Sequence, residues 1–240
     1  MKINLLHLGG NGGVPKIWNR TDKLNIISSD GVWQNKKLVF CRKVNSRKEN
    51  LFFSSSGGWR KFFIYKDKFL SSFHRPSQIQ NNRYSKKSFE IVRTLYVKPI
   101  TIDKFSKERN LTIHALDIDC QGHTLPILKG AKNSLKKVLL IKCEVDFIEL
   151  YKNASHAGDI FNFLRGKDYC LVRTFSCGNE RFPYSYDTPN YSKKRSDGLI
   201  AWMDCVFLKN PARVRKQSRS QRQAFKQICG FIGTPSLYIP

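Results

Sequence analysis

Residue types that can bind a ligand follow the first apolar segment of the chain. The segment LHLGGNGGVP (6–15) has four glycines in five positions, interrupted by one asparagine. Glycine permits positive φ and a close approach of backbone to a ligand, so a strand that runs into such a turn is a common seat for a nucleotide. An ordinary glycine-rich loop has the same composition, because a lone glycine cluster is a weak motif. The turn residues are Gly9, Gly10, Asn11, Gly12 and Gly13.

A carboxylate ends the second apolar segment, LNIISSDG. Asp30 follows Gly13 by 17 residues, which is close to the separation found in nucleotide-binding α/β units. In such units the carboxylate at the end of the second strand accepts hydrogen bonds from ribose hydroxyls. The glycine turn and Asp30 together favour a nucleoside-binding site.

Further carboxylates lie at the ends of two later apolar segments. Asp119 closes IHALDIDC (113–120), and Glu144 lies near the end of VLLIKCEVDF (138–147). Such a group can remove a proton from a reacting oxygen, or it can cap the next helix or accept backbone hydrogen bonds. The five histidines are too dispersed to predict a metal site. A GxxxxGK[ST] phosphate loop is absent from the sequence, which disfavours nucleoside triphosphate hydrolysis.

Alternating strands and helices must position these residues. A mainly parallel sheet with helices on both faces follows from that alternation, so the fold class is α/β. Ligands in such sheets bind at the carboxyl ends of the strands. The segment 50–84 is expected to form a hairpin and a loop. Strands are predicted at 2–8, 24–31, 36–44, 90–97, 113–120, 138–147, 169–175 and 201–209, and helices at 101–110, 124–137 and 156–168.

The charge of the chain is strongly positive and uneven. Lys and Arg number 43 against 18 Asp and Glu, a net charge of +25, with the excess in the first half and in the tail. Such an excess favours nucleic acid, anionic headgroups or phosphorylated sugar carriers, although a solvated basic surface explains it equally well. No apolar run reaches the roughly 20 residues of a membrane span. The short apolar start does not fit a secretion signal. We expect a cytoplasmic protein that could meet a membrane peripherally.

The middle of the chain resembles a known family. IHALDIDCQGHTLPILKGAKNSLKKVLLIKCEVDFIELYKNASHAGDIFNFLRGKDY is similar to the FkbM family of S-adenosylmethionine-dependent methyltransferases, and the likeness extends over about residues 3–210, which leaves 211–240 as a basic C-terminal tail. The sequence departs from the family pattern at His7, where an acid is usual, at Asp117, where Lys is common, and at Thr124, where Glu is common. The matching positions are Asp119, Gln121, Gly122, Leu128, Gly130, Ala131, Glu144 and Tyr151.

The resemblance implies a Rossmann-like class I methyltransferase fold with a seven-stranded sheet. It implies S-adenosyl-L-methionine as cofactor and methyl transfer to a hydroxyl oxygen of a sugar, a glycan intermediate or a small metabolite. His7 and the 9–13 turn would bind the cofactor, with Asp30 on its ribose. Asp119 is the first candidate for the catalytic base and Glu144 the second, and no metal is expected. Contacts to the acceptor are predicted for Ser71, Ser72 and Gln121.

Two other functions are compatible with the same sequence. The basic first half and tail could hold a phosphorylated or lipid-linked acceptor, but they could also serve an RNA-binding protein or an RNA methyltransferase. Against RNA, the aromatic residues lie in apolar runs and do not alternate with the basic residues as a stacking platform needs. The other alternative is a homologue of the methyltransferases that keeps the fold but does not catalyse the reaction.

Overall fold

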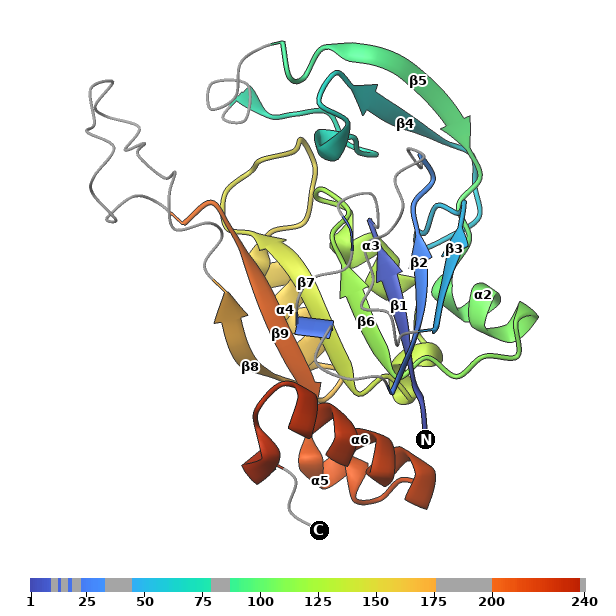
Figure 1. Ribbon diagram of the computed structural model, residues 1–240. Helices are drawn as coiled ribbons and strands as arrows, with labels where there is room; N and C mark the ends of the chain where they lie inside the picture. The colour runs from blue at the N-terminus through green and yellow to red at the C-terminus, as the bar shows by residue number, and fades with distance from the viewer. Residues whose placement is uncertain are drawn as a thin grey trace.

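The protein is built around one seven-stranded sheet (Figure 1). The computed structural model describes residues 1–9, 13, 17–18, 23–32, 45–78, 87–175 and 200–237. The strand order is β3-β2-β1-β6-β7-β9-β8. The strands are β1 (Ile3–Leu8), β2 (Leu24–Ser29), β3 (Asn45–Glu49), β6 (Ala115–Ile118), β7 (Leu140–Asp146), β8 (Tyr169–Phe175) and β9 (Trp202–Lys209).

The sheet is mixed, because one strand runs against the others. Neighbours from β3 to β7 pair in parallel, whereas β9 is antiparallel to both β7 and β8. The predicted mainly parallel sheet therefore contains one reversed strand. The strand predicted at 36–44 lies outside the described residues, and the third strand that the structure describes is β3. Strand order reverses beside β1, which has β2 and β6 on its two sides, and such a reversal opens a crevice at the carboxyl ends.

Helices cover the two faces of the sheet. On one face α2 (Ile102–Glu108), α3 (Thr124–Lys129), η4 (Ser134–Lys136) and α4 (Ala157–Arg165) pack on a large apolar cluster from β1, β6 and β7. On the other face α5 (Pro211–Val214) and α6 (Arg219–Phe231) cover the amino-terminal half of the strands, where Leu5, Leu140 and Phe225 share a second cluster. This arrangement leaves the carboxyl-terminal half of the second face to polar residues.

The ends of the predicted helices carry the expected capping residues. The Thr101 hydroxyl accepts a hydrogen bond from the Lys104 N–H at 3.0 Å at the start of α2, as an N-cap threonine does. At the start of α4 the Asp159 carboxylate accepts from the His156 N–H at 3.1 Å, and α4 ends at Gly166 as predicted. These three helices lie where the sequence predicts them, although α3 is shorter than the predicted segment 124–137.

A separate hairpin lies over the carboxyl ends of β1 and β2 (Figure 1). It consists of β4 (Arg60–Tyr65) and β5 (Ile91–Val97), which pair antiparallel. The strand β4 falls in the segment predicted as a hairpin and a loop, but its partner β5 lies beyond that segment. A third apolar cluster joins the hairpin and η3 (Lys68–Leu70) to the chain after β7. Its members include Phe63, Tyr65, Leu70, Phe89 and Tyr151.

The chain after residue 210 carries its basic residues on the outside. Ala224, Phe225 and Ile228 of α6 are buried against the sheet, whereas Arg219 and Arg222 are exposed. A short turn, η5 (Pro235–Leu237), follows. Among the helices of the described ranges, none combines the length and apolar character that crossing a membrane requires.

Candidate functional site

A cavity of about 160 Å³ opens where β1, β2 and β6 end. Each of these strands places a predicted site residue at its wall: Gly9 after β1, Asp30 after β2 and Asp119 after β6. The cavity therefore lies at the predicted crevice of the sheet. Its further lining includes Phe52, Phe62, Phe69, Ser71, Phe73, Cys120 and Gln121.

Only glycine fits at position 9, because the ends of β1 and β6 approach each other closely there. Its φ is +84°, and a Cβ atom at this position would stand 1.7 Å from the backbone oxygen of Asp119. A side chain would therefore force β1 and β6 apart at the cavity wall. Gly13 also has a positive φ, +87°, but open space around it. The other predicted turn residues, Gly10, Asn11 and Gly12, lie outside the described residues.

Asp30 lines the cavity directly after the end of β2. Its Oδ1 accepts a hydrogen bond from the Val32 N–H at 2.8 Å, which fixes the turn that follows β2. Next to it, a Cβ on Gly31 would meet the Phe52 ring at 2.1 Å. The ribose-binding role of Asp30 stays a prediction, and its place on the cavity wall fits that role.

Three phenylalanine rings form an aromatic wall of the cavity. Phe52 and Phe62 have centroids 4.8 Å apart, and Phe73 lies 5.8 Å from the first and 5.1 Å from the second. Phe73 also lies against His123, with ring centroids 4.4 Å apart. Such a wall offers flat apolar surface to a planar ring.

A hydrogen-bond chain fixes the carboxylate of Asp119. The Gln121 amide donates to Asp119 Oδ1 at 3.0 Å, and the Tyr151 hydroxyl donates to Gln121 Oε1 at 2.8 Å. The Asp119 side chain borders the cavity and can be reached by water, yet protein atoms crowd around it. Burial and the charges of Asp204 and Asp117 raise its pKa to about 6, although Lys142 and the Gln121 bond lower it. Asp119 can therefore exchange a proton near neutral pH.

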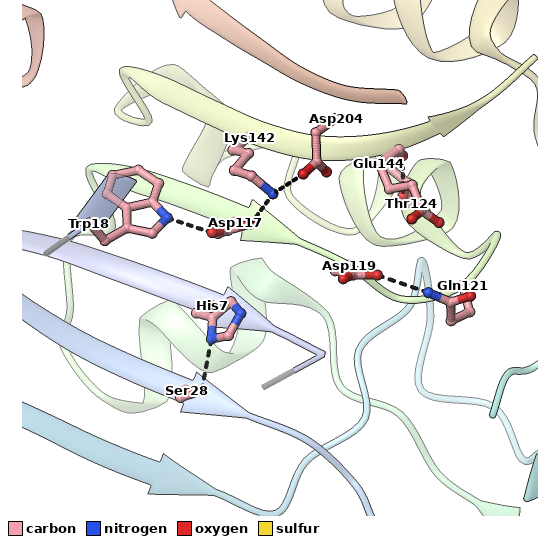
Figure 2. A network of polar contacts seen from close by, with 10 residues as sticks. All are labelled: His7, Trp18, Ser28, Asp117, Asp119, Gln121, Thr124, Lys142, Glu144 and Asp204. Carbon is pink, nitrogen blue, oxygen red and sulfur yellow. Dashed lines mark hydrogen bonds and ion pairs between the residues drawn. The ribbon is translucent and has the colours of Figure 1, made fainter. Parts of the chain in front are cut away.

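A charged cluster lies on three adjacent strands of the sheet beside Asp119 (Figure 2). The Lys142 ammonium is 3.0 Å from Asp204 Oδ2 and 3.5 Å from Asp117 Oδ1, and the Trp18 indole N–H donates to Asp117 Oδ2. Burial lowers the pKa of Lys142, but Asp117 and Asp204 outweigh that effect and raise it. Lys142 is therefore held as a cation below the cavity.

Glu144 lies directly between two other carboxylates. It pairs in register with Asp204 of β9, and Asp119 follows Ile118, the neighbour of Cys143. Burial and the charges of Asp119, Asp146 and Asp204 raise the pKa of Glu144 well above its ordinary value. The two predicted catalytic carboxylates, Asp119 and Glu144, are thus brought together by adjacent strands.

His7 lies within the sheet beside the cluster and is absent from the cavity lining. It is 2% exposed, and its Nδ1 shares a hydrogen bond of 2.9 Å with the Ser28 hydroxyl. Burial lowers the pKa of His7, opposed by the charge of Asp117. A contact between His7 and the cofactor stays a prediction, and the hydrogen bond to Ser28 gives the neutral ring a role inside the sheet.

The two predicted acceptor serines lie differently. Ser71 lines the cavity, and its hydroxyl accepts a hydrogen bond from the Tyr65 N–H at 3.3 Å. Ser72 is 1% exposed, donates to the Gln121 carbonyl at 2.6 Å and accepts from the His74 N–H at 3.0 Å. Ser72 thus joins the hairpin to the Asp119–Gln121 segment. Acceptor contacts by either serine stay predictions.

Two histidines that the sequence places far apart meet beside the aromatic wall. His74 Nδ1 donates to the Lys152 carbonyl at 3.2 Å, so its Nε2 accepts from His123 Nδ1 at 3.0 Å. The remaining nitrogen of His123 then accepts from the Ser54 hydroxyl at 3.0 Å. Burial lowers the pKa of both rings, that of His123 to about 3. This chain of hydrogen bonds therefore joins two neutral imidazole rings, and it holds the loop after Gly122 against the hairpin.

Sequence reasoning did not find several of these residues. Phe52, Phe62 and Phe73 come from an irregular stretch with no periodic pattern. Lys142 and Asp204 could have been noticed, because each is a charged residue that interrupts a largely apolar segment. Within the described ranges, groups of three or more His, Cys, Asp or Glu residues that could hold a metal ion do not occur.

Comparisons with known proteins identify the family of the chain. Residues 32–171 match the methyltransferase FkbM domain, whereas none of the curated proteins matches the chain. Among solved structures, the chain is similar to a candidate DNA modification methyltransferase encoded within a prophage of E. coli, with 9% identity and a TM-score of 0.36. That likeness covers 91% of this chain and 50% of the other, so this chain spans half of that protein's length. The FkbM match covers more than half of the chain, and the protein belongs to the FkbM methyltransferase family.

Proposed function

We propose that the protein transfers a methyl group from S-adenosyl-L-methionine to a hydroxyl oxygen of a sugar, a glycan intermediate or another small metabolite in the cytoplasm. The observation that carries the proposal is the convergence of Gly9, Asp30 and Asp119 on one cavity at the reversal of strand order. Membership of the FkbM family supports methyl transfer. The cofactor and the acceptor are our inference from the residues.

The residues at the cavity fit the proposed cofactor. Gly9 keeps the wall free of a side chain, since a Cβ would collide with Asp119. The aromatic wall of Phe52, Phe62 and Phe73 suits an adenine ring, and Asp30 can accept hydrogen bonds from ribose hydroxyls. When bound, the cofactor supplies a methyl group on a sulfonium, which leaves as a thioether.

The carboxylates provide what the acceptor needs. In the transfer the bond between sulfur and methyl carbon breaks, an oxygen–methyl bond forms, and the hydroxyl proton must go to a base. Asp119 is the first candidate for that base because Gln121 and Tyr151 orient it and its pKa of about 6 leaves it ionised at neutral pH. Glu144, whose pKa burial and the neighbouring carboxylates also raise, is the second candidate.

Binding of S-adenosylhomocysteine, measured by calorimetry, tests the proposal. We expect the parent protein to bind it and Asp30→Asn to bind it about 10-fold more weakly, since a charged hydrogen bond contributes about 1.5–3 kcal/mol. Asn can keep the turn bond to Val32, so this variant removes charge without removing the turn. Glu90→Gln, an exposed acid on the hairpin, is the control. Parent protein that binds no S-adenosylhomocysteine would sink the proposal and favour a homologue without catalysis.

Asp119→Asn separates chemistry from binding. We expect the variant to bind S-adenosylhomocysteine like the parent and to lose methyl transfer by about 10²–10⁴-fold, the usual contribution of a positioned base. Full transfer activity in Asp119→Asn would exclude Asp119 as the base and leave Glu144.

A polyanion partner is a second candidate, favoured by the exposed basic residues of α5 and α6. Arg215, Lys216, Arg219 and Arg222 are exposed, and the segment 209–237 contains no acid. These residues lie at the end of the sheet away from the cavity (Figure 1), so they could hold RNA, or the phosphate of a lipid-linked acceptor, only at a distance from Asp119. Retention on RNA that disappears with added salt would support this candidate.

A further inference from the structure

A group of acidic residues adjoins Asp119 in a strongly basic chain. Five carboxylates lie near the carboxyl ends of β6 and β7 and the amino end of the antiparallel β9, and Lys142 is the cation that the described residues place among them. The chain has only 18 acids against 43 basic residues, so composition alone does not produce such a group. The acidic row consists of Asp117, Asp119, Glu144, Asp146 and Asp204.

The acidic row is extended and does not converge on a point. Glu144 and Asp204 are neighbours across β7 and β9, and Asp119 stands on the next strand, with adjacent strands about 4.8 Å apart. The part of the chain that the structure describes contains no His, Cys, Asp or Glu group arranged to hold a metal ion. The row therefore suits an elongated molecule better than a single metal ion.

Asp146 contributes to the row a buried carboxylate oxygen whose hydrogen-bonding capacity is unused among the described residues. The residue is 4% exposed, and among the described residues its Oδ1 has no hydrogen-bond partner. Successive strand residues alternate between the faces of a sheet, so Asp146 shares the face of Lys142 and Glu144 on β7. Buried polar atoms in native proteins are nearly always paired, and an orphan of this kind calls for a ligand that pairs with it.

The row also holds more negative charge than Lys142 balances. Burial and the neighbouring carboxylates raise the pKa of Asp119 to about 6 and that of Asp146 to about 7. Asp119 and Asp146 therefore retain their protons to higher pH than usual, because Lys142 alone does not balance the charge of the row. The positive charge of a bound sulfonium offsets at most one carboxylate, so a cationic group on the acceptor is favoured as well.

We propose that the methyl acceptor carries a protonated amino group, held by Asp146 and Asp204, next to the hydroxyl that faces Asp119. A hydroxylated amine such as an amino sugar has this chemistry. The inference rests on the proposed function, because it assigns the acceptor of the same site. A phosphate group is repelled by the row, so a phosphorylated acceptor enters it only with its opposite end.

Binding of three sugars of similar size tests the proposed charge. Methyl glucosaminide has a free amine, methyl N-acetylglucosaminide has the same ring without the charge, and glucose 6-phosphate has the opposite charge. We expect saturation-transfer NMR at pH 7 to show binding of the amine at least about 10-fold tighter than of the acetylated sugar. Equal binding of these two, tighter binding of the phosphate, or binding of none of the three would overturn the proposal.

Two variants locate the binding. Asp146→Asn removes the orphan charge with little change of shape, and we expect it to weaken the amine about 10-fold without affecting the acetylated sugar. Asp103→Asn is the matched control, because Asp103 accepts backbone hydrogen bonds from Asn133 and Ser134 away from the row. An equal loss in both variants, or none in Asp146→Asn, would refute the assignment of Asp146.

The same samples separate this inference from the proposed function. S-adenosylhomocysteine binding is measured in parallel, and the sugars are tested with and without it. Failure to bind S-adenosylhomocysteine contradicts the proposed cofactor, whereas a missing preference for the amine in protein that does bind it contradicts only the acidic acceptor site.

Discussion

Replacing Asp146 by Asn should make the protein more stable above neutral pH. Asp146 is buried, its Oδ1 finds no partner in the part of the chain that the structure describes, and burial together with the charge of Asp119 raises its pKa from 3.8 to about 7. A pKa unit corresponds to about 1.4 kcal/mol, so about three units set an upper limit near 4 kcal/mol on the destabilisation by the ionised group. We expect about 2 kcal/mol in practice, because the Asn amide also lacks a partner.

The pH dependence of this gain identifies its cause. Between about pH 4 and pH 7 the folded state keeps the Asp146 proton and the unfolded state has lost it. Stability of the parent therefore falls as pH rises through this range, and the advantage of Asp146→Asn should be absent near pH 4 and complete above pH 7. The facing groups Asp119 and Glu144 titrate in both proteins and cancel to first order.

Urea unfolding of parent and variant at pH 4.5 and pH 8 measures the effect. Asp119→Asn should reduce the gain when combined with Asp146→Asn, since Asp119 contributes to the raised pKa. A variant that is no more stable at pH 8, or that is stabilised equally at both pH values, would refute the reasoning.

Three further predictions concern the frame of the site. Gly9→Ala should cost more than about 3 kcal/mol of unfolding free energy and abolish S-adenosylhomocysteine binding, because its methyl group would overlap the Asp119 backbone at positive φ; wild-type stability by urea unfolding would contradict the close contact. Lys142→Met should cost about 3–5 kcal/mol by leaving the fully buried Asp117 without its cation, with Lys142→Arg closer to the parent; a Lys142→Met protein as stable as the parent in urea would contradict a stabilising role of this ion pair. Because burial, His74 and Arg60 lower the pKa of His123 to about 3, the unfolded state binds the proton first, and stability should fall as pH drops below 6.5. Thermal unfolding of His123→Gln should show a weaker acid dependence, and an unchanged slope would remove His123 as its cause.

Local patterns in the sequence predict what each strand end carries. Apolar segments that stop at Gly9, Asp30, Asp119 and Glu144 predict both the strands and the edge of the sheet where these residues meet, because parallel strands end on the same side. The cavity lies at that edge. Helix boundaries such as Gly166 follow from capping and periodicity, which are also local.

Contacts between segments that are distant in the sequence could not be predicted from local patterns. The register that sets Glu144 opposite Asp204 depends on the insertion of β9 between β7 and β8, and nothing near either residue specifies it. The aromatic wall depends on how the hairpin folds over the sheet, and Phe52, Phe62 and Phe73 show no periodic spacing. The pairing of His74 with His123 has the same origin.

The departures from the FkbM pattern each have a partner in the structure. His7 bonds Ser28, and the Thr124 hydroxyl donates to the Glu144 carbonyl at 3.1 Å, which ties α3 to β7. Asp117 faces Lys142 in register on the adjacent strand. An acid in place of a common lysine at 117 makes this position more negative by two charges, and the Lys142 ammonium lies 3.5 Å from its Oδ1. The departure at 117 therefore adds a carboxylate to the acidic row, from which we infer a cationic acceptor.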